Sequence, residues 1–467
     1  METKLVKNLQ EAIMLSGLKS GMSVSFHHHL RNGDYTLNMV MDQIAAMNIR
    51  DLTLNASSLF DTHLPLEAHI RSGVVRKINT NYMSQGLGHL ISEGLMEEPV
   101  DFRTHGGRPR DISLGITPID VAFIAAPASD CAGNCSGKFG PSACGSLGYA
   151  FPDAMYAKKV IVITDHLVDY PLSGWSIPEI YVDYVVQVDA IGNPAGIVSG
   201  TTKITRDPVG LIMAQTAVKV IQHSGLLKDG FSFQTGAGGA SLAAARFLMD
   251  VMLKSDIHGS FASGGITGYL VDMLNAGCFQ SLMDVQCFDL KAVESIREDP
   301  RHQEISALQY ASPSSKSAVV NSLDVVILGA TEIDTDFNVN VHTDSNGYIM
   351  GGSGGHSDTA DGAKLSLIIA PMFRARLPIV TDRVQCISTP GRDIDVLVTQ
   401  GGIAVNPARA DLREKLANAG LPVVDIRELK ERTERITGTP RPIVRGDRVV
   451  AEVISREGQL LDRIYQV

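Results

Sequence analysis

The sequence predicts an α/β protein of two tandem domains with mainly parallel sheets. Short, continuous apolar runs recur along the chain, and such runs are typical of parallel strands buried on both faces. Apolar residues three and four positions apart fall between several of them, as at residues 37–47 and 242–252, which indicates amphipathic helices. With 467 residues, the chain is too long for one ordinary hydrophobic core.

Nine apolar runs are the best candidates for strands. They lie at residues 22–26, 51–55, 121–126, 160–164, 184–188, 261–263, 325–328, 366–370 and 396–399. Helical patterns separate several of these runs, and alternation of strands with helices favours βαβ units, which produce parallel sheets.

The first crossover shows the order of elements clearly. A strand ends near Phe26, a polar turn covers residues 27–34, a helix follows, and a strand returns at Leu52. Ligands of open α/β sheets bind beyond the carboxyl ends of the strands. We therefore expect the turn at residues 27–34 to lie on a functional edge of the sheet.

We place the domain boundary near residue 228, which gives domains at residues 1–228 and 229–467. An amphipathic stretch at residues 211–223 precedes the boundary. A strand at residues 231–234 follows it and restarts the order of strand, special turn, amphipathic helix and strand. The two domains are therefore expected to be related in architecture.

The tail of the chain has a different character. Residues 409–435 are charged and follow a helical pattern, whereas residues 443–464 are expected to form a short antiparallel cap.

Charge and composition exclude several classes of protein. Hydrophobic residues make up 44% of the chain and charged residues 20%, as in a folded globular protein. The net charge of −10 supplies no basic face for nucleic acid. No apolar run approaches the ~20 residues of a membrane-spanning helix. Residues 1–11 are charged and lack the apolar segment of a secretory signal, so we expect a cytoplasmic protein that binds neither nucleic acid nor membrane.

The six cysteines do not indicate a metal site. Cys131, Cys135 and Cys144 lie close together, but a zinc site needs paired short spacings that are absent here. We expect reduced thiols.

Two glycine clusters stand where strands pass into helices, at residues 236–239 and 351–355. Glycine lets the backbone approach a ligand closely, and amide N–H groups at a helix start bind phosphates, carboxylates and oxyanions. Neither cluster has the dinucleotide fingerprint or the ending of a nucleotide P-loop. The clusters predict a site for anions or acyl groups. Tight turns or close packing remain the alternative, which is favoured for residues 236–239.

The first predicted turn carries His27, His28, His29 and Arg31. Arginine binds carboxylates through two parallel hydrogen bonds, so this turn is a candidate for binding an anionic substrate, as are Arg374, Arg376, Arg383 and Arg392. For any one arginine, a solvated surface position or a domain-stabilising salt bridge is the favoured alternative. A metal needs two or three converging ligands, and consecutive residues of an extended turn point apart, so we predict no metal site.

Several motifs resemble those of a known enzyme family. Gly-Tyr-Ile-Met-Gly-Gly-Ser-Gly-Gly-His-Ser-Asp at residues 347–358 and Thr-Gln-Gly-Gly-Ile-Ala at residues 399–404 resemble the C-terminal domain of CoA-transferases. Residues 25–34 and 128–137 add matching motifs in the N-terminal half. Over nearly its full length, the chain resembles the alpha subunits of citrate lyase. The resemblance implies two Rossmann-like CoA-transferase domains with the active site in the cleft between them.

The resemblance also implies a reaction and its partners. The enzyme would exchange the acetyl group of an acetyl thioester for citrate and give the citryl thioester and acetate. The thioester is acetyl-CoA or the CoA-like prosthetic group of an acyl-carrier (gamma) subunit, and it acts as a substrate rather than as a permanently bound cofactor. A beta subunit then cleaves the citryl thioester, so we expect an oligomeric complex. A citramalate-specific enzyme would have much the same sequence.

The chain departs from the family pattern at one position. Many CoA-transferases carry a nucleophilic glutamate that aligns with Gly264, yet no glutamate lies between Asp256 and Gln280. We therefore expect the carboxylate of citrate to attack the thioester directly. The oxyanion would need backbone donors, for which the candidates are Gly264, Gly265, Gly352, Gly354 and Gly355. Gly236, Gly238 and Gly239 are candidates for substrate binding.

The residues after the second glycine cluster allow different roles. His356 is a candidate contact for substrate, and Asp358 is expected to cap the next helix. A sugar-phosphate isomerase of the same architecture would instead use Asp358, Asp361 or Lys364 near a general base. A catalytically silent scaffold subunit is a further alternative.

Overall fold

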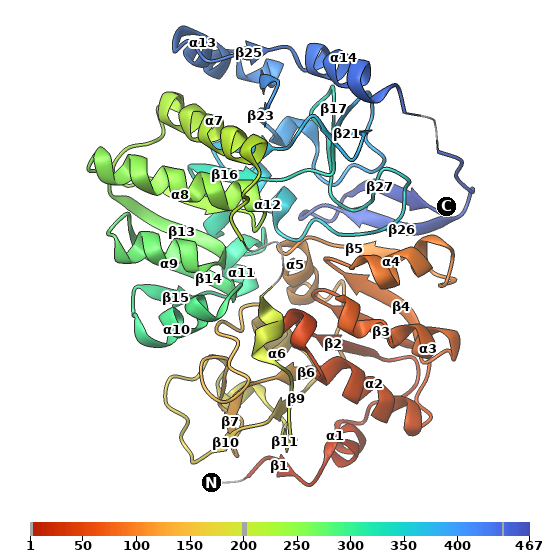
Figure 1. Cartoon of the computed structure of the whole chain (residues 1–467). Helices are drawn as coiled ribbons and strands as arrows, with labels where there is room; N and C mark the ends of the chain where they lie inside the picture. The colour runs from red at the N-terminus through yellow and green to blue at the C-terminus, as the bar shows by residue number, and fades with distance from the viewer. Residues whose placement is uncertain (1–2, 199–202, 441–442) are drawn as a thin grey trace.

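The computed structural model describes residues 3–198, 203–440 and 443–467. Its strands form two large, mainly parallel sheets (Figure 1). In spatial order the first sheet contains β1 (Leu5–Val6), β11 (Tyr184–Gln187), β9 (Lys159–Thr164), β6 (Val121–Ala125), β2 (Ser23–Phe26), β3 (Leu52–Ala56), β4 (Val75–Thr80), β5 (Val100–Phe102), β26 (Val449–Ile454) and β27 (Leu460–Tyr465). Within the described residues, only its last pairing, β26 with β27, is antiparallel.

The second sheet repeats this architecture. In spatial order it contains β15 (His302–Glu304), β14 (Phe279–Cys287), β13 (Gly259–Ile266), β12 (Ser232–Thr235), β16 (Val325–Leu328), β19 (Leu365–Ile369), β23 (Val396–Thr399), β24 (Gly402–Val405) and β25 (Val423–Val424). Only β23 and β24 pair in the antiparallel direction. All nine predicted strands are present in the two sheets, and the predicted α/β class with mainly parallel sheets is confirmed.

Three smaller sheets lie in the loops of the described part of the chain. They are formed by β7 (Ala128–Asp130), β8 (Cys135–Ser136) and β10 (Leu167–Val168), by β17 (Glu332–Asp334), β18 (Val339–Asn340) and β22 (Val380–Thr381), and by β20 (Phe373–Arg374) with β21 (Leu377–Pro378).

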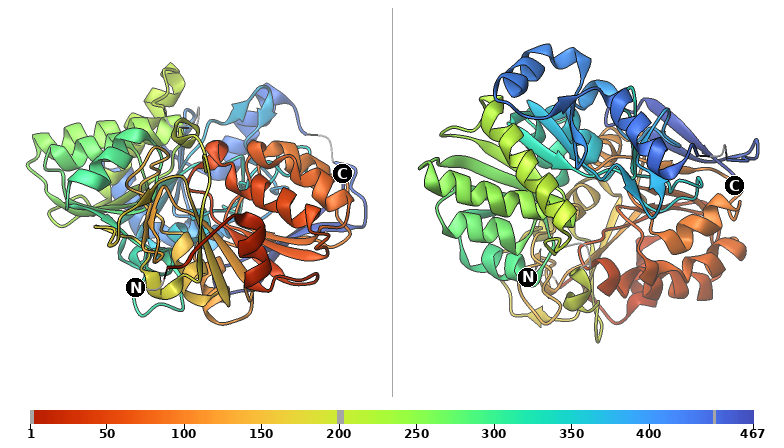
Figure 2. Two further views of the ribbon diagram at one scale, coloured as in Figure 1. Left: turned by 90° about the horizontal axis from the view of Figure 1, so that it is seen from below. Right: turned by 45° about the horizontal axis from the view of Figure 1, so that its top comes forward.

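Helices cover the sheets, and Figure 2 shows the green helices of residues 208–298 on the opposite side of the molecule from the red to orange helices of residues 9–92. The α-helices are α1 (Leu9–Ser16), α2 (Thr36–Ala46), α3 (Leu66–Arg71), α4 (Gln85–Ser92), α5 (Gly107–Ser113), α6 (Ala150–Tyr156), α7 (Pro208–Ser224), α8 (Gly239–Lys254), α9 (Gly268–Asn275), α10 (Leu290–Glu298), α11 (Ala307–Ala311), α12 (His356–Gly362), α13 (Ala410–Asn418) and α14 (Ile426–Thr437). Single turns of 3₁₀ helix lie at Arg31–Gly33, Asp61–His63, Glu179–Tyr181, Pro194–Ile197, Val319–Ser322, Gly391–Asp393 and Pro407–Arg409. No helix in the described ranges has both the length and the apolar character that crossing a bilayer requires.

Local sequence explains where α2 begins. The Asp34 carboxylate accepts hydrogen bonds from the amides of Thr36 (3.0 Å) and Leu37 (3.2 Å), which satisfies two donors at the helix start. The apolar positions predicted for this helix, among them Val40 and Ile44, face the core. The turn at residues 27–34 therefore lies, as predicted, between the end of β2 and the start of α2.

Two segments cross the predicted boundary at residue 228. Helix α7 lies before it but packs on α8, β19 and β23 of the second sheet. The hairpin β26–β27 lies far after it, yet β26 pairs with β5 of the first sheet, as Figure 1 shows. The predicted antiparallel cap is thus a true hairpin, but it extends the first sheet. The division into domains at 1–228 and 229–467 stays a prediction.

Candidate active site between the two sheets

The glycine cluster of the second half lies directly on turns of the first half. The amide of Gly354 donates to the carbonyl of Asn81 (3.2 Å), and the amide of His105 donates to the carbonyl of Gly354 (2.8 Å). A Cβ atom on Gly352 would lie 2.3 Å from the carbonyl oxygen of Asn81, so only glycine fits there. We call this contact, formed by Asn81 and His105 with residues 351–355, the seam.

Part of the predicted set of oxyanion donors is already engaged at the seam. The Gly354 amide is committed to Asn81 and is not free for a ligand. The amides of Gly352 and Gly355 donate no hydrogen bond within the described part of the chain. Gly352 and Gly355 therefore remain predicted donors, whereas Gly354 acts in joining the two halves.

Gly264 and Gly265 lie at the end of β13, where the pairing with β14 shifts its register. Gly264 has a φ of +100°, a conformation that side chains rarely adopt, and a Cβ atom on it would lie 2.7 Å from the side chain of Gln234. A Cβ atom on Gly265 would lie 2.3 Å from the ring of Phe288. The space that a side chain at either position would need is thus filled.

The three histidines follow β2 as predicted and are all buried. His27 and His29 do not point apart: their Nδ1 atoms are 2.6 Å from each other and share a hydrogen bond. The prediction considered consecutive residues, whose side chains point apart on extended backbone. Side chains two residues apart, such as those of His27 and His29, lie on the same face. His28 instead bonds through Nδ1 to the hydroxyl of Ser57 (2.6 Å).

These histidines, together with His105, are uncharged near neutral pH. Burial lowers the pKa of His27 to about 4 and that of His105 to about 3. Burial also lowers the pKa values of His28 and His29 well below the ordinary value, and neighbouring imidazoles lower them further. The rings therefore offer hydrogen bonds and not positive charge.

Arg31 supplies the positive charge of this turn. Its guanidinium carbon lies 5.3 Å from the ring centre of Phe60 and 4.8 Å from that of Phe288, so one ring from each half holds it. Its Nη1 is shielded from solvent and has no hydrogen-bond partner in the described ranges. Arg31 also has a φ of +52°, a strained conformation for a side chain of this size. Strain and an unpaired buried donor together make Arg31 a candidate for binding a carboxylate.

Aromatic rings connect the histidine turn to the seam. The ring centre of Tyr149 lies 4.7 Å from that of His28 and 4.4 Å from that of His105. Neither His105 nor Tyr149 was predicted from the sequence. Ligands of α/β sheets bind beyond the carboxyl ends of the strands, so His105 would have been a candidate if the short strand β5 before it had been recognised.

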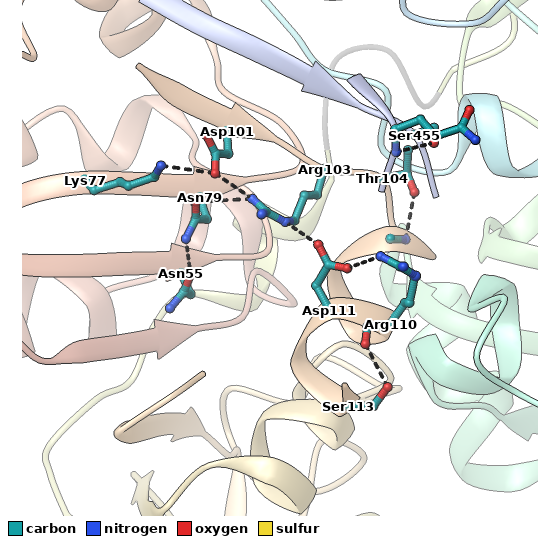
Figure 3. Close-up of polar contacts among 12 residues, drawn as sticks. Asn55, Lys77, Asn79, Asp101, Arg103, Thr104, Arg110, Asp111, Ser113 and Ser455 are labelled. Carbon is teal, nitrogen blue, oxygen red and sulfur yellow. Dashed lines mark hydrogen bonds and ion pairs between the residues drawn. The ribbon is translucent and has the colours of Figure 1, made fainter. Parts of the chain in front are cut away.

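A polar network fixes the turn that carries His105 (Figure 3). Arg103 donates to Asp101 (3.0 Å) and Asn79 (3.2 Å) through Nη1 and to Asp111 (2.8 Å) through Nε. The hydroxyl of Thr104 accepts from the amide of Gly107 (2.8 Å). Because these groups are almost fully buried, the turn is held rigidly.

His356 does not face an open site. Its Nε2 donates to the carbonyl of Gly329 (2.9 Å), and its Nδ1 accepts from the hydroxyl of Thr389 (2.8 Å). Burial lowers its pKa to about 4. Both ring nitrogens are therefore satisfied within the protein, which leaves the predicted contact of His356 with substrate without support.

Asp358 is not the cap of α12, because Gly355 occupies that position. Its Oδ2 accepts from the amide of Gly106 (2.8 Å), which links α12 to the start of α5 in the first half. Burial raises the pKa of Asp358 to about 7. The prediction of a cap was wrong because a long-range partner replaces the local amides.

The raised pKa of Asp358 predicts a pH dependence of stability. In the unfolded chain this carboxyl ionises near its ordinary pKa, so its favourable contribution is complete below that pKa and is lost as the pH rises through about 7. Relative to Asp358→Asn, the wild-type free energy of unfolding should fall by roughly 2–3 kcal/mol between pH 5 and pH 8. Urea denaturation of both proteins at the two pH values measures this. An unchanged difference would contradict the raised pKa.

The cluster at residues 236–239 is open. Gly236 donates to the carbonyl of Ile327 (2.9 Å), and Gly238 precedes α8 without a side-chain cap. A Cβ atom on either would have no neighbour closer than 3.6 Å, whereas one on Gly239 would lie 3.0 Å from the carbonyl of Lys203. The favoured packing explanation therefore applies to Gly239 and finds no support at Gly236 or Gly238.

Cysteine and metal chemistry lie outside this site. All six cysteines belong to the described ranges and are free. Asp284, Cys287 and His302 lie close enough together to hold a metal ion. However, the Cys287 thiol (3.0 Å) and His302 (2.9 Å) already bond to the carboxylate of Asp284. Burial also raises the pKa of Cys287 well above its ordinary value, so the thiol keeps its proton.

The comparisons with known proteins agree over the whole chain. Residues 2–467 match the family described as "Citrate lyase, alpha subunit (CitF)". The chain is 51% identical to the citrate lyase alpha chains of Klebsiella pneumoniae and Escherichia coli (strain K12), over its full length and over 92% and 91% of those proteins.

Solved structures give the same result. A crystal structure described as the putative alpha subunit of citrate lyase in complex with citrate, from Streptococcus mutans, is 49% identical. It superimposes with a TM-score of 0.98 over 100% of this chain and 92% of the other. The alpha subunit of a malonate decarboxylase from Acinetobacter baumannii shares the fold, with a TM-score of 0.69 at 18% identity over 93% of this chain and 89% of the other. The chain therefore belongs to the family of citrate lyase alpha subunits.

Proposed function

We propose that the protein exchanges the acetyl group of an acetyl thioester for citrate and gives citryl thioester and acetate. The observation that carries this proposal is the buried, unpaired Nη1 of Arg31, which points to a carboxylate ligand in a chain 49% identical to a protein whose structure contains citrate. The thioester is acetyl-CoA or the prosthetic arm of an acyl-carrier subunit. The protein acts as the alpha subunit of a cytoplasmic complex with beta and gamma subunits.

The proposed reaction needs no general base. A carboxylate of citrate, already ionised, forms a C–O bond to the acetyl carbonyl carbon and pushes negative charge onto the carbonyl oxygen. The intermediate collapses, the C–S bond breaks, and the thiolate leaves behind a mixed anhydride. The thiolate then attacks the citryl carbonyl, and acetate departs. The protein must orient the two reactants and stabilise each oxyanion.

Direct attack is supported by the surroundings of Gly264. Gln234 and Phe288 fill the space beside Gly264 and Gly265 that an enzyme glutamate would otherwise take. We expect borohydride treatment during turnover with acetyl-CoA to leave the enzyme active and unmodified, because no glutamyl thioester forms. Peptide mass spectrometry checks this, with a glutamate-dependent CoA-transferase as the positive control. A reduced glutamate in this chain would disprove direct attack.

Two of the three candidate bases of the isomerase alternative are held in ion pairs. Lys364 pairs with Asp324 (2.8 Å), Asp361 pairs with Arg456, and Asp358 accepts from the amide of Gly106. Asp361 and Lys364 are thus held in ion pairs, whereas Oδ1 of Asp358 has no partner in the described ranges, so a sugar-phosphate isomerase would have to use Asp358 as its base.

The deciding experiment mixes the purified protein with citrate and acetyl-CoA. Acetate and citryl-CoA should appear in equal amounts, and citramalate in place of citrate measures substrate preference. A folded protein that forms neither product would support the scaffold alternative and overturn the proposal.

A further inference from the structure

Tyr310 lies on α11 with its hydroxyl buried beside the seam. Its ring is 2% exposed, and a Cβ atom on Gly355 would lie 2.6 Å from the hydroxyl oxygen. The hydroxyl oxygen is 2.7 Å from Nε2 of Gln234, the side chain that fills the space beside Gly264. The hydroxyl group therefore lies between the seam and the position that aligns with the glutamate nucleophile of related enzymes.

The direction of these hydrogen bonds leaves one proton unused. The Ser263 hydroxyl donates to Oε1 of Gln234 (3.0 Å), which turns Nε2 toward Tyr310. An amide nitrogen only donates, so the hydroxyl oxygen of Tyr310 accepts this bond. The hydrogen of the Tyr310 hydroxyl has no acceptor in the described part of the chain. Burial raises the pKa of Tyr310, so the group keeps that hydrogen at neutral pH.

The structure assigns to Tyr310 the role of a side-chain hydrogen-bond donor to the oxyanion of acyl transfer, with Gln234 as its positioning residue. This assignment rests on the proposed function. It also explains how the site works although the Gly354 amide is committed to Asn81. The hydroxyl donates a hydrogen bond that strengthens as negative charge grows on the carbonyl oxygen. This hydrogen bond weakens again when the intermediate collapses. No proton is transferred, and the reaction stays balanced as written above.

The test compares the steady-state kinetics of Tyr310→Phe with those of the wild-type protein, using citrate and acetyl-CoA. Loss of one oxyanion donor lowers kcat by roughly 10²-fold. We expect that loss with KM for citrate within about threefold, because the donor acts on the transition state and not on bound citrate. Tyr184→Phe is the matched control, since its hydroxyl bonds the Leu15 carbonyl (3.1 Å) at the far edge of the first sheet. This control should keep wild-type kcat.

Gln234→Met provides a second, independent test if Tyr310→Phe folds poorly. It keeps the side-chain volume but releases the hydroxyl, so kcat should fall, and the double variant should lose no more than Tyr310→Phe alone. Wild-type activity in Tyr310→Phe, or additive losses in the double variant, would overturn the assignment while leaving the proposed function intact. An inactive wild-type protein would overturn both.

Discussion

Replacement of Arg31 by methionine should lower kcat/KM for citrate by roughly 10²- to 10³-fold, because removing one partner of a buried charge pair costs about 2–5 kcal/mol. The guanidinium is held between Phe60 and Phe288, and its Nη1 has no partner in the described ranges. Citrate would supply the missing carboxylate. Most of the loss should appear in KM for citrate, whereas KM for acetyl-CoA should change little.

Arg31→Lys and Arg383→Met sharpen this test. Lysine keeps the positive charge but lacks the planar guanidinium group that makes two parallel hydrogen bonds. Arg31→Lys should therefore recover only part of the affinity for citrate. Arg383 lies in a separate cavity of about 650 Å³ that also contains Arg376 and Glu332. Its replacement should leave the kinetics unchanged. A normal KM for citrate in Arg31→Met would show that citrate binds elsewhere.

The largest effect on stability is expected for Arg108→Met. Arg108 forms two hydrogen bonds of 2.8 Å with the carboxylate of Asp153, and both side chains are almost completely buried. Its loss leaves a buried carboxyl without a cation and should lower the free energy of unfolding by about 3–5 kcal/mol. Urea denaturation monitored by circular dichroism measures the change.

A second substitution separates charge from packing. Arg108→Met combined with Asp153→Leu removes both charged groups and should regain most of the lost stability. The pair of the exposed Lys158 with the half-buried Asp120 is the control, and Lys158→Met should cost less than about 1 kcal/mol. Equal losses in the single and double variants would mean that the volume of Arg108, rather than its charge, is what matters.

The sequence predicts the central strands well because they are buried on both faces. Strands β6 and β16 consist entirely of buried apolar residues, so a continuous apolar run identifies them. Strand β4 contains Arg76 and Lys77, and β5 has Asp101 at its centre. Those polar residues interrupt the pattern, and both strands were missed.

The site is only partly predictable for a related reason. Arg31 and the glycine clusters follow from residue type and from position at strand ends. The partners of Arg31, and the contact between Gln234 and Tyr310, come from elements far apart in the chain. Local patterns carry no information about such contacts. Asp358 shows the converse error, since its carboxylate accepts from the distant amide of Gly106 and does not cap its own helix.

The pairing of β26 with β5 has a consequence for biosynthesis. Synthesis runs from the N-terminus, so β5 leaves the ribosome long before its neighbour has been made. Until residues 449–454 have been made, that edge exposes unpaired amides that can recruit a strand from another nascent polypeptide. The first sheet therefore gains this neighbour only after residues 449–454 have been synthesised.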